Sequence, residues 1–335
     1  MTSESRRPFF SVIMNCYNGE EYLKRAIDSV YSQKFKDWEI IFVNNASTDS
    51  SRCIAQSYCD KLKYYQLPQT LPYGYARKFA VEQASGEWIT FLDVDDFWDV
   101  RKLQVQHNRL HESNFVICYA GFYSVDIGGR VFGTTLPSLE SGSLLGGQLL
   151  QFEVNTVTMA LRRDILIAHN ITYNGELTSS ADDNIVLRLL AKGSCCVIHM
   201  PLAYYTVSQN SLSAREMKNW ASDRFATATQ LKLENPDSET RYFVQLREYI
   251  ARGHYYSARY LMHLGSYPEA RHALGEATKN RKSYCIFFIL SFIPYLWDAI
   301  HQPKIKILLS KLYFKIFNIF RAKGAENHSL PEALK

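Results

Sequence analysis

Apolar runs alternate with helical periodicities along the first part of the chain. Runs of β-branched and aromatic residues predict strands, and apolar positions three and four apart predict helices. The strands are expected at 9–15, 38–43, 62–67 and 87–92, and the helices at 20–33, from Ser47 or Thr48 toward Tyr58, and at 75–84. Strands that alternate with helices in this way predict a parallel sheet with helices on both faces.

The alternation continues in the next part of the chain. Further strands are expected at 115–125, 131–132, 156–161 and near 196–199, and further helices at 144–152, after 162–164 and after Ser179 or Ser180. A turn at 126–130 is expected to lead from one of these strands into the next. These elements extend the alternation of strands and helices as far as Trp220.

From Trp220 onward the strands end and only helices are expected. They fall at 219–235, 240–264 and 267–280, separated by Pro236 and by the Gly-Ser-Tyr-Pro sequence of 265–268. Residues 251–277 resemble a tetratricopeptide-type helix hairpin. One such unit cannot bury its own faces, so we expect it to pack on the α/β domain or on a partner.

The C-terminal segment is apolar and basic. Residues 284–297 are too short to span a bilayer, and Pro294 interrupts them. Residues 303–323 predict an amphipathic helix with an apolar stripe and lysines along its edge, which suits an anionic membrane surface. The alternative is a helix that packs on the domain or in a homodimer.

Composition and charge narrow the class of protein. A chain of 335 residues with 47% hydrophobic residues can form a packed core. The seven cysteines are scattered without a paired C-x-x-C, which indicates reduced thiols in the cytoplasm, and no signal peptide is expected. The net charge is +5, but residues 281–323 hold eight basic residues against one aspartate. The remaining chain is slightly acidic, so nucleic-acid binding is disfavoured.

Three carboxylates follow the expected strand at 87–92. Asp93, Asp95 and Asp96 come directly after an apolar run, and adjacent carboxylates repel one another and resist joint burial. A divalent cation that also binds phosphate oxygens would neutralise them. The alternative is a loop of solvated or helix-capping aspartates.

Polar residues also follow the first two strands. These are Asn15 to Tyr17 and the pair Asn44-Asn45. In a parallel sheet, ligands bind beyond the carboxyl ends of the strands. These segments and the aspartates are therefore expected to meet in one crevice, which favours a site for a phosphate or a nucleotide.

Three segments together carry a family resemblance. Residues 11–23 (SVIMNCYNGEEYL), 38–49 (WEIIFVNNASTD) and 84–96 (ASGEWITFLDVDD) strongly resemble the family 2 glycosyltransferases, which have the GT-A fold. The resemblance covers roughly residues 8 to 215. It implies transfer of a sugar from a nucleotide diphosphate donor with inversion at the anomeric carbon.

The resemblance also implies roles for the donor side of the site. Asp93 and Asp95 match the family's D-x-D, with Asp95 the direct ligand of Mn²⁺ or Mg²⁺ and Asp93 nearer the ribose. Tyr17 matches a residue that packs on the base, although it also suits a partly buried core position. Asn15 belongs to the same donor-binding group. Arg77 resembles a basic residue near the donor, with a solvated helix residue as the alternative.

Two positions depart from the family pattern. Asn45 stands where an aspartate that accepts a hydrogen bond from the base is common. An amide oxygen also accepts such a bond, but it brings no charge. On the acceptor side, Asp182 matches the general base, Ala181 replaces a frequent glutamate, and Asp183 is the fallback base. The family's loop over the diphosphate offers Gln209 and Ser211 here, so a metal ligand from this loop is not expected.

These observations lead to one interpretation. We expect an inverting glycosyltransferase with a GT-A, Rossmann-like mixed sheet at 8–215, a helical region at 216–282 and a membrane-associating tail at 283–323. UDP is the favoured nucleotide, and a glycan or lipid-linked acceptor at the inner face of the plasma membrane is the expected partner. The alternatives are a donor-binding but inactive scaffold and a nucleotidyltransferase, which lacks support because no glycine-rich phosphate loop follows the first strand.

Overall fold

The computed structural model describes residues 7–58, 60–207 and 216–301. The chain divides into two compact units, Met1–Tyr256 and Ser257–Lys335. The division falls inside one long helix. The expected domain boundary at residue 215 stays a prediction. The expected boundaries at 216–282 and 283–323 stay predictions.

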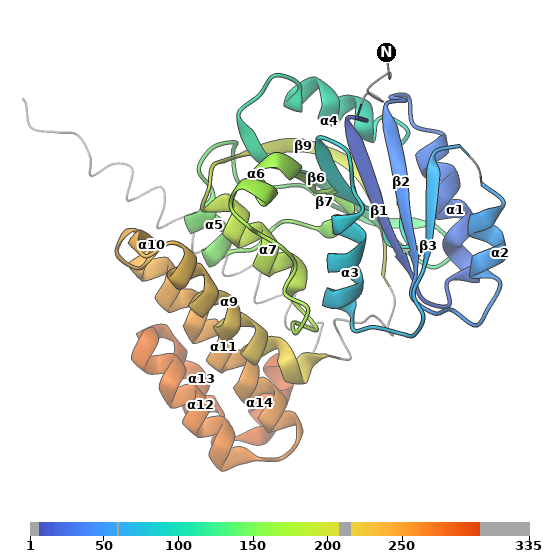
Figure 1. The fold of residues 1–335 in the computed structure, drawn as a ribbon. Helices are drawn as coiled ribbons and strands as arrows, with labels where there is room; N and C mark the ends of the chain where they lie inside the picture. Colours follow the sequence, from blue (N-terminus) through green and yellow to red (C-terminus); the bar gives the residue numbers. More distant parts are fainter. Residues whose placement is uncertain (1–6, 59, 208–215, 302–335) are drawn as a thin grey trace, which may run out of the picture. The chain divides into compact units, whose positions relative to one another are not determined.

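Nine strands of the described residues form one sheet in the order β3-β2-β1-β4-β8-β6-β9-β5, with β7 paired to β6 (Figure 1). Their bounds are β1 (Phe10–Cys16), β2 (Trp38–Asn44), β3 (Leu62–Gln66), β4 (Trp88–Phe91), β5 (Phe97–Trp98), β6 (Phe115–Val125), β7 (Val131–Thr135), β8 (Ala160–Arg162) and β9 (Ser194–Thr206). Strands β1 to β4 are parallel, and β8 pairs with both β4 and β6 in antiparallel fashion. The mixed α/β sheet predicted from the sequence is confirmed.

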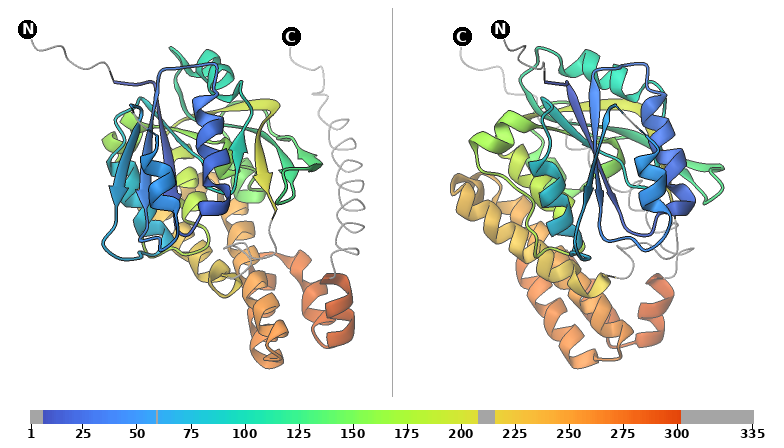
Figure 2. Two further views of the ribbon diagram at one scale, coloured as in Figure 1. Left: turned by 90° about the vertical axis from the view of Figure 1, so that its right-hand side faces the viewer. Right: turned by 45° about the vertical axis from the view of Figure 1, so that its right-hand side comes forward.

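Among the helices of the first unit, α1, α2 and α4 pack on one face of this sheet and α3, α5, α6 and α7 on the other (Figures 1 and 2). Their bounds are α1 (Glu20–Tyr31), α2 (Ser51–Gln56), α3 (Tyr73–Glu82), α4 (Lys102–Leu110), α5 (Leu145–Leu150), α6 (Arg163–Ala168), α7 (Ala181–Leu190), α9 (Trp220–Glu234), α10 (Asp237–Arg241) and α11 (Phe243–His263), the last of which runs into the second unit.

Alternation along β1 separates two hydrophobic cores. Val12 and Met14 point to the face that buries Leu23 and Ile27 of α1, whereas Ile13 points to the face covered by α3. Because helices cover both faces, the central strands are apolar at nearly every position. This explains why these strands could be predicted from continuous apolar runs in the sequence.

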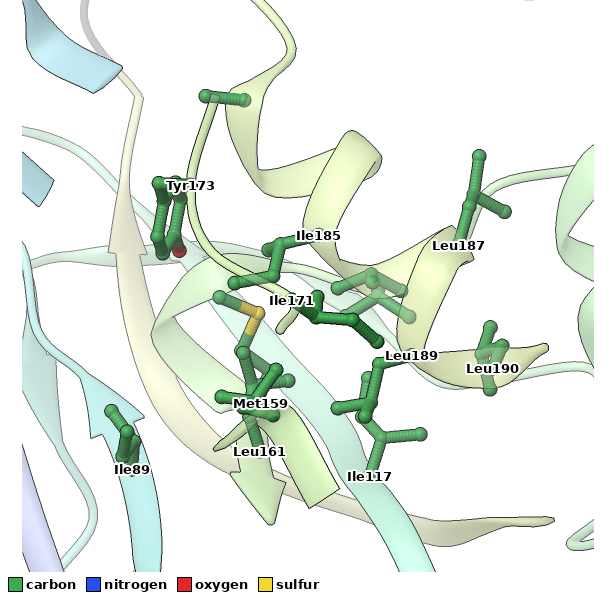
Figure 3. Close-up of a cluster of buried hydrophobic side chains, with 14 of the residues drawn as sticks. Ile89, Ile117, Met159, Leu161, Ile171, Tyr173, Ile185, Leu187, Leu189 and Leu190 are labelled. Atoms are coloured by element: carbon green, nitrogen blue, oxygen red, sulfur yellow. The ribbon is translucent and has the colours of Figure 1, made fainter. Parts of the chain in front are cut away.

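Helix α7 packs on the same side of the sheet as α3, over one continuous hydrophobic core. Figure 3 shows Ile185 and Leu189 of α7 above Met159, Leu161 and neighbouring side chains, with the ring of Tyr173 at the edge of the group. All of these side chains are buried. Deleting one such aliphatic side chain to alanine costs about 2–5 kcal/mol of folding free energy, so α7 is held firmly on the sheet.

Several element boundaries differ from those expected. Helix α2 begins at Ser51, because the Ser47 hydroxyl accepts a hydrogen bond from the Asn18 N–H at 3.0 Å instead of capping a helix. Part of the strand expected at 156–161 is a 3-10 turn at Thr156–Thr158. Strand β9 is much longer than the expected 196–199, and β5 and α4 were not predicted.

The second unit contains helices α12 (Tyr267–Asn280), α13 (Cys285–Leu290) and α14 (Pro294–His301). Gly265, with φ of +75°, provides the left-handed residue between α11 and α12, as the sequence predicted for this break. The interruption at Pro294 is likewise confirmed. The helix expected at 303–323 lies outside the described residues.

Large apolar side chains remain exposed on α13 and on the turn into α14. They include Ile286, Ile289, Phe292, Ile293 and Tyr295. Among the described residues, no single helix has the length and apolar character needed to cross a membrane. The segments Lys282–Leu290 and Pro294–His301 reach that length and composition only as a pair, and a bend of 118° separates them.

Candidate active site

The polar segments that follow β1, β2 and β4 meet at one edge of the sheet. The Asn45 N–H donates to the Cys16 carbonyl at 2.7 Å, and the Leu92 N–H donates to the Ile13 carbonyl at 3.0 Å. These bonds carry the sheet register past the last residues of the strands. The expected convergence is therefore present in the structure.

Arg77 on α3 is the centre of a buried polar network at this edge. Its side chain is inaccessible to solvent and forms an ion pair with Asp93. A second guanidinium nitrogen donates to the Asn15 Oδ1 at 3.3 Å, and the Asn15 amide donates to the Ala76 carbonyl at 3.0 Å. Arg77 is thus not the solvated helix residue that was held as the alternative; it neutralises the first carboxylate of the D-x-D.

The other two aspartates have different environments. Asp95 forms no ion pair within the described residues, and burial together with the Asp93 charge raises its pKa to about 6. Asp96 is buried and accepts a hydrogen bond from the Thr206 N–H at 2.7 Å, and burial raises its pKa well above the ordinary value. Asp96 therefore ties the loop to β9, while Asp95 carries charge that a cation would compensate.

Both asparagines after β2 are engaged with the protein itself. Asn45 is buried, and its amide donates to the Leu71 carbonyl at 2.9 Å while its Oδ1 accepts from the Leu71 N–H at 2.8 Å. Asn44 donates to the Tyr64 hydroxyl at 3.0 Å. Asn45 therefore holds the segment that leads into α3, and its role toward a base stays a prediction.

Tyr17 is 55% exposed beside these groups. It is therefore not part of the buried core, and its role toward a base stays a prediction. An exposed ring at the carboxyl end of β1 is available to a planar ligand.

Asp182 lies in the first turn of α7 and receives two phenolic hydrogen bonds. Tyr73 of α3 donates to its Oδ2 at 2.8 Å, and Tyr173 donates to its Oδ1 at 2.7 Å. Arg77 donates through its Nε to the Tyr73 oxygen at 2.9 Å. A continuous chain of contacts thus joins Asp182 to Arg77 and Asp93. Asp182 is far from the other two residues in the sequence.

Asp183, the fallback base, faces a different group of residues. Burial raises its pKa to about 7, although the Arg224 charge opposes the shift. Asp182 and Asp183 therefore lie in distinct environments, as expected for successive helical residues.

The N-terminus of α7 is stabilised by a residue that the sequence reasoning missed. Ser180 makes no side-chain cap hydrogen bond. Instead the Asp223 Oδ2, on α9, accepts from the N–H groups of Ser179 and Ser180 at 2.8 and 3.2 Å and from the Ser179 hydroxyl at 2.7 Å. The expected serine cap is replaced by an aspartate of another helix, because a carboxylate accepts several donors at once.

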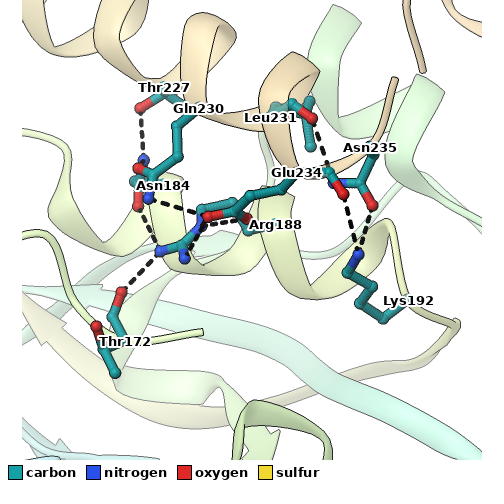
Figure 4. A network of polar contacts seen from close by, with 9 residues as sticks. All are labelled: Thr172, Asn184, Arg188, Lys192, Thr227, Gln230, Leu231, Glu234 and Asn235. Atoms are coloured by element: carbon teal, nitrogen blue, oxygen red, sulfur yellow. Dashed lines mark hydrogen bonds and ion pairs between the residues drawn. The ribbon is translucent and has the colours of Figure 1, made fainter. Parts of the chain in front are cut away.

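Further polar contacts join α7 to α9 (Figure 4). Arg188 makes a bidentate ion pair with Glu234, with distances of 2.7 and 2.8 Å to its two oxygens. Asn184 donates to Gln230 at 3.0 Å and to Thr227 at 3.2 Å. Helix α9 therefore belongs to the framework that positions Asp182.

Two other sets of polar side chains are potential ligands. His199 lies on β9, near Glu140 at 3.6 Å. Gln209 and Ser211 lie outside the described residues. Within the part of the chain that the structure describes, no group of three or more His, Cys, Asp or Glu side chains is arranged to hold a metal ion.

The mixed sheet, the polar residues that meet at the carboxyl ends of its strands and the D-x-D define a protein of the GT-A class. Over residues 11–169 the chain matches the family model described as Glycosyl transferase family 2. The chain therefore carries a family 2 glycosyltransferase domain, which confirms the resemblance found in the sequence. The structure of TarS from S. aureus has the same fold.

Curated relatives are also glycosyltransferases. An uncharacterised glycosyltransferase of Haemophilus influenzae is 34% identical over 155 residues, which cover 45% of this chain and 61% of the relative. This chain thus spans about three fifths of the length of that relative. The Escherichia coli enzyme WfgD, named UDP-Glc:alpha-D-GlcNAc-diphosphoundecaprenol beta-1,3-glucosyltransferase, is 26% identical over 62% of this chain and 81% of its own length.

A solved structure shows the same fold. TarS of S. aureus (residues 1–349), in complex with UDP-GlcNAc, superposes with a TM-score of 0.67 at 20% identity. The superposition covers 86% of this chain and 88% of that chain.

Proposed function

We propose that this protein is an inverting glycosyltransferase that uses a UDP-sugar donor and a hydroxyl of a lipid-linked glycan as acceptor. The observation that carries the proposal is the chain of contacts from Asp93 through Arg77 and Tyr73 to Asp182. It places a D-x-D and a second carboxylate at the same end of the sheet. The donor of TarS and the donor named for WfgD support UDP.

The residues present fit a divalent cation together with the donor. Mg²⁺ and Mn²⁺ bind through one or two carboxylates and complete their coordination with water and substrate phosphates. Burial and the Asp93 charge disfavour an ionised Asp95 in the absence of a cation, and Asp93 is close by in the sequence, so these two would hold the ion. The bound ion would supply positive charge to the departing diphosphate.

The protein's own groups supply the rest of the reaction. The acceptor oxygen forms a bond to the anomeric carbon while the bond from that carbon to the diphosphate oxygen breaks. Asp182 takes the proton of the acceptor hydroxyl, and attack opposite the leaving diphosphate inverts the configuration. The exposed ring of Tyr17 packs on the base.

A lipid-linked acceptor agrees with the second unit and with the tail. WfgD acts on a diphosphoundecaprenol acceptor. The exposed apolar residues of α13 and the basic surplus of residues 281–323 suit an anionic membrane surface. We therefore place the enzyme peripherally at the inner face of the plasma membrane, associated through residues 283–323.

Calorimetric titration with UDP, GDP and dTDP, each with and without Mn²⁺, tests the donor part of the proposal. Of the three nucleotides, we expect only UDP to bind tightly, and only when Mn²⁺ is present. We expect Asp95→Ala to lose that binding, because the substitution removes the main carboxylate ligand of the ion. Failure of a well-folded protein to bind any of the three would favour the inactive scaffold.

Asp182→Asn tests the base. We expect turnover to fall by roughly 100-fold or more, because general-base catalysis typically contributes 10²–10⁴-fold, while UDP affinity stays close to wild type. Asp183→Asn is the matched control and retains most of the activity. Full turnover by the Asp182 variant would remove this carboxylate from the mechanism.

A further inference from the structure

Two tyrosines surround the carboxylate of Asp182, and neither was predicted from the sequence. Tyr173 donates to one carboxylate oxygen at 2.7 Å, and Tyr73 donates to the other at 2.8 Å. Burial raises the pKa of both phenols well above the ordinary value, so both stay protonated and remain donors.

The direction of the Tyr73 hydrogen bond is fixed by Arg77. An arginine can only donate, and the Arg77 Nε–H is directed at the Tyr73 oxygen at 2.9 Å. The phenolic proton of Tyr73 is therefore left for Asp182. Arg77 is itself held by Asp93 and Asn15 and is inaccessible to solvent, so this arrangement has little freedom.

The ring of Tyr173 is equally constrained. It is 2% exposed, lies edge-on to Phe91 with ring centroids 5.9 Å apart, and borders the core that contains Ile185 (Figure 3). Its hydroxyl therefore approaches Asp182 from a fixed position.

Close packing brings the two tyrosines together. A Cβ added to Gly74, next to Tyr73, would lie 2.6 Å from the Asn174 carbonyl oxygen and 3.0 Å from that of Leu177. Only glycine allows α3 to begin so close to the segment that follows Tyr173.

We propose that Tyr73 and Tyr173 are positioning residues for Asp182, which they orient toward the acceptor hydroxyl; this inference rests on the proposed function. Each carboxylate oxygen accepts more than one hydrogen bond, so a phenol on each oxygen leaves a lone pair for the acceptor. Asp182 is only partly buried, so an acceptor can reach it. Arg77 and Asp183 are the other charged groups near this carboxylate.

Steady-state kinetics of Tyr73→Phe and Tyr173→Phe test the proposal. We expect kcat to fall roughly 10- to 100-fold, because a misplaced reacting group costs about that much, while KM for the UDP-sugar stays within about twofold. Tyr75→Phe, on the exposed side of α3, is the matched control and keeps the wild-type kcat. The positioning role would be overturned if kcat were unchanged in both variants, or if KM rose by as large a factor as kcat fell.

A double-mutant cycle in thermal stability tests the contact without relying on catalysis. We expect Tyr73→Phe to lower the melting temperature of the wild type but to change it little in the Asp182→Ala background, because alanine leaves no acceptor for the phenol. Additive effects would overturn the proposed pairing. An inactive wild type that still shows the coupling would contradict the proposed function instead.

Discussion

Asn45 shows how a single residue is read differently in the sequence and in the fold. The family resemblance suggested a hydrogen-bond acceptor for the base. In the structure both ends of its amide bind the backbone of Leu71, a pairing that needs one donor and one acceptor. An aspartate offers only acceptors at this position, so the residue is matched to the segment that leads into α3.

Asn45→Asp is expected to lower the free energy of unfolding by about 1–3 kcal/mol, because the Leu71 carbonyl then loses its donor inside the protein. Urea denaturation measures the change. Asn108→Asp, at an exposed position of α4, serves as the control and is expected to change little. Equal stability of the two variants would show that the Leu71 contact contributes nothing.

At the scale of elements, α7 is the helix whose position matters most for the site. Its first turn carries Asp182, its N-terminus depends on Asp223, and its far side is joined to α9 by Arg188 and Glu234. The helix was predictable from its apolar pattern and its acidic first turn. Its cap was not, because the capping carboxylate lies more than forty residues later in the sequence.

Asp223→Ala is expected to cost about 2–4 kcal/mol of folding stability, the sum of a lost cap and of buried donors left unpaired. Because the first turn of α7 then loosens, kcat is also expected to fall. Thermal unfolding and turnover measure both effects. Asp237→Ala, an exposed aspartate in the first turn of α10, is the control; a loss of the same size in both variants would refute the capping role.

At the scale of the molecule, the two units have different surfaces. The first carries the sheet and the site, and the second exposes large apolar side chains on α13 and near α14. Exposed large apolar side chains that gather in one segment are typical of surfaces that contact a membrane or another protein, so these side chains agree with the proposed attachment to a membrane.

Flotation with phosphatidylglycerol vesicles tests the attachment. We expect the full chain to float with the vesicles at low salt and less at high salt, because screening weakens the attraction of the basic residues to the anionic lipid. Ile289→Asp combined with Phe292→Asp is expected to abolish flotation, whereas Leu233→Asp, an equally exposed position on α9, is expected to retain it. Full-length protein that stays with the soluble fraction would contradict the attachment.

The sequence by itself determined the alternation of strands and helices and the meeting of polar residues at the carboxyl ends of the parallel strands, whereas the mixed sheet was implied by the family resemblance. The apolar pattern of a single segment, such as 38–44 or 88–91, is enough to predict a strand. The edge at which the polar residues meet follows from the geometry of parallel strands. It also indicated a cation site at the D-x-D, since carboxylates bind divalent cations, and the family resemblance indicated Asp182.

Only the tertiary structure decided what those residues touch. Arg77 is a buried ion-pair partner of Asp93, and Asn45 forms hydrogen bonds with the backbone of Leu71. Asp223 caps α7. Tyr73 and Tyr173 gained their partner because Gly74 lets two segments approach closely. Such contacts join residues distant in the sequence, and their strength depends on burial and direction, which no local pattern contains.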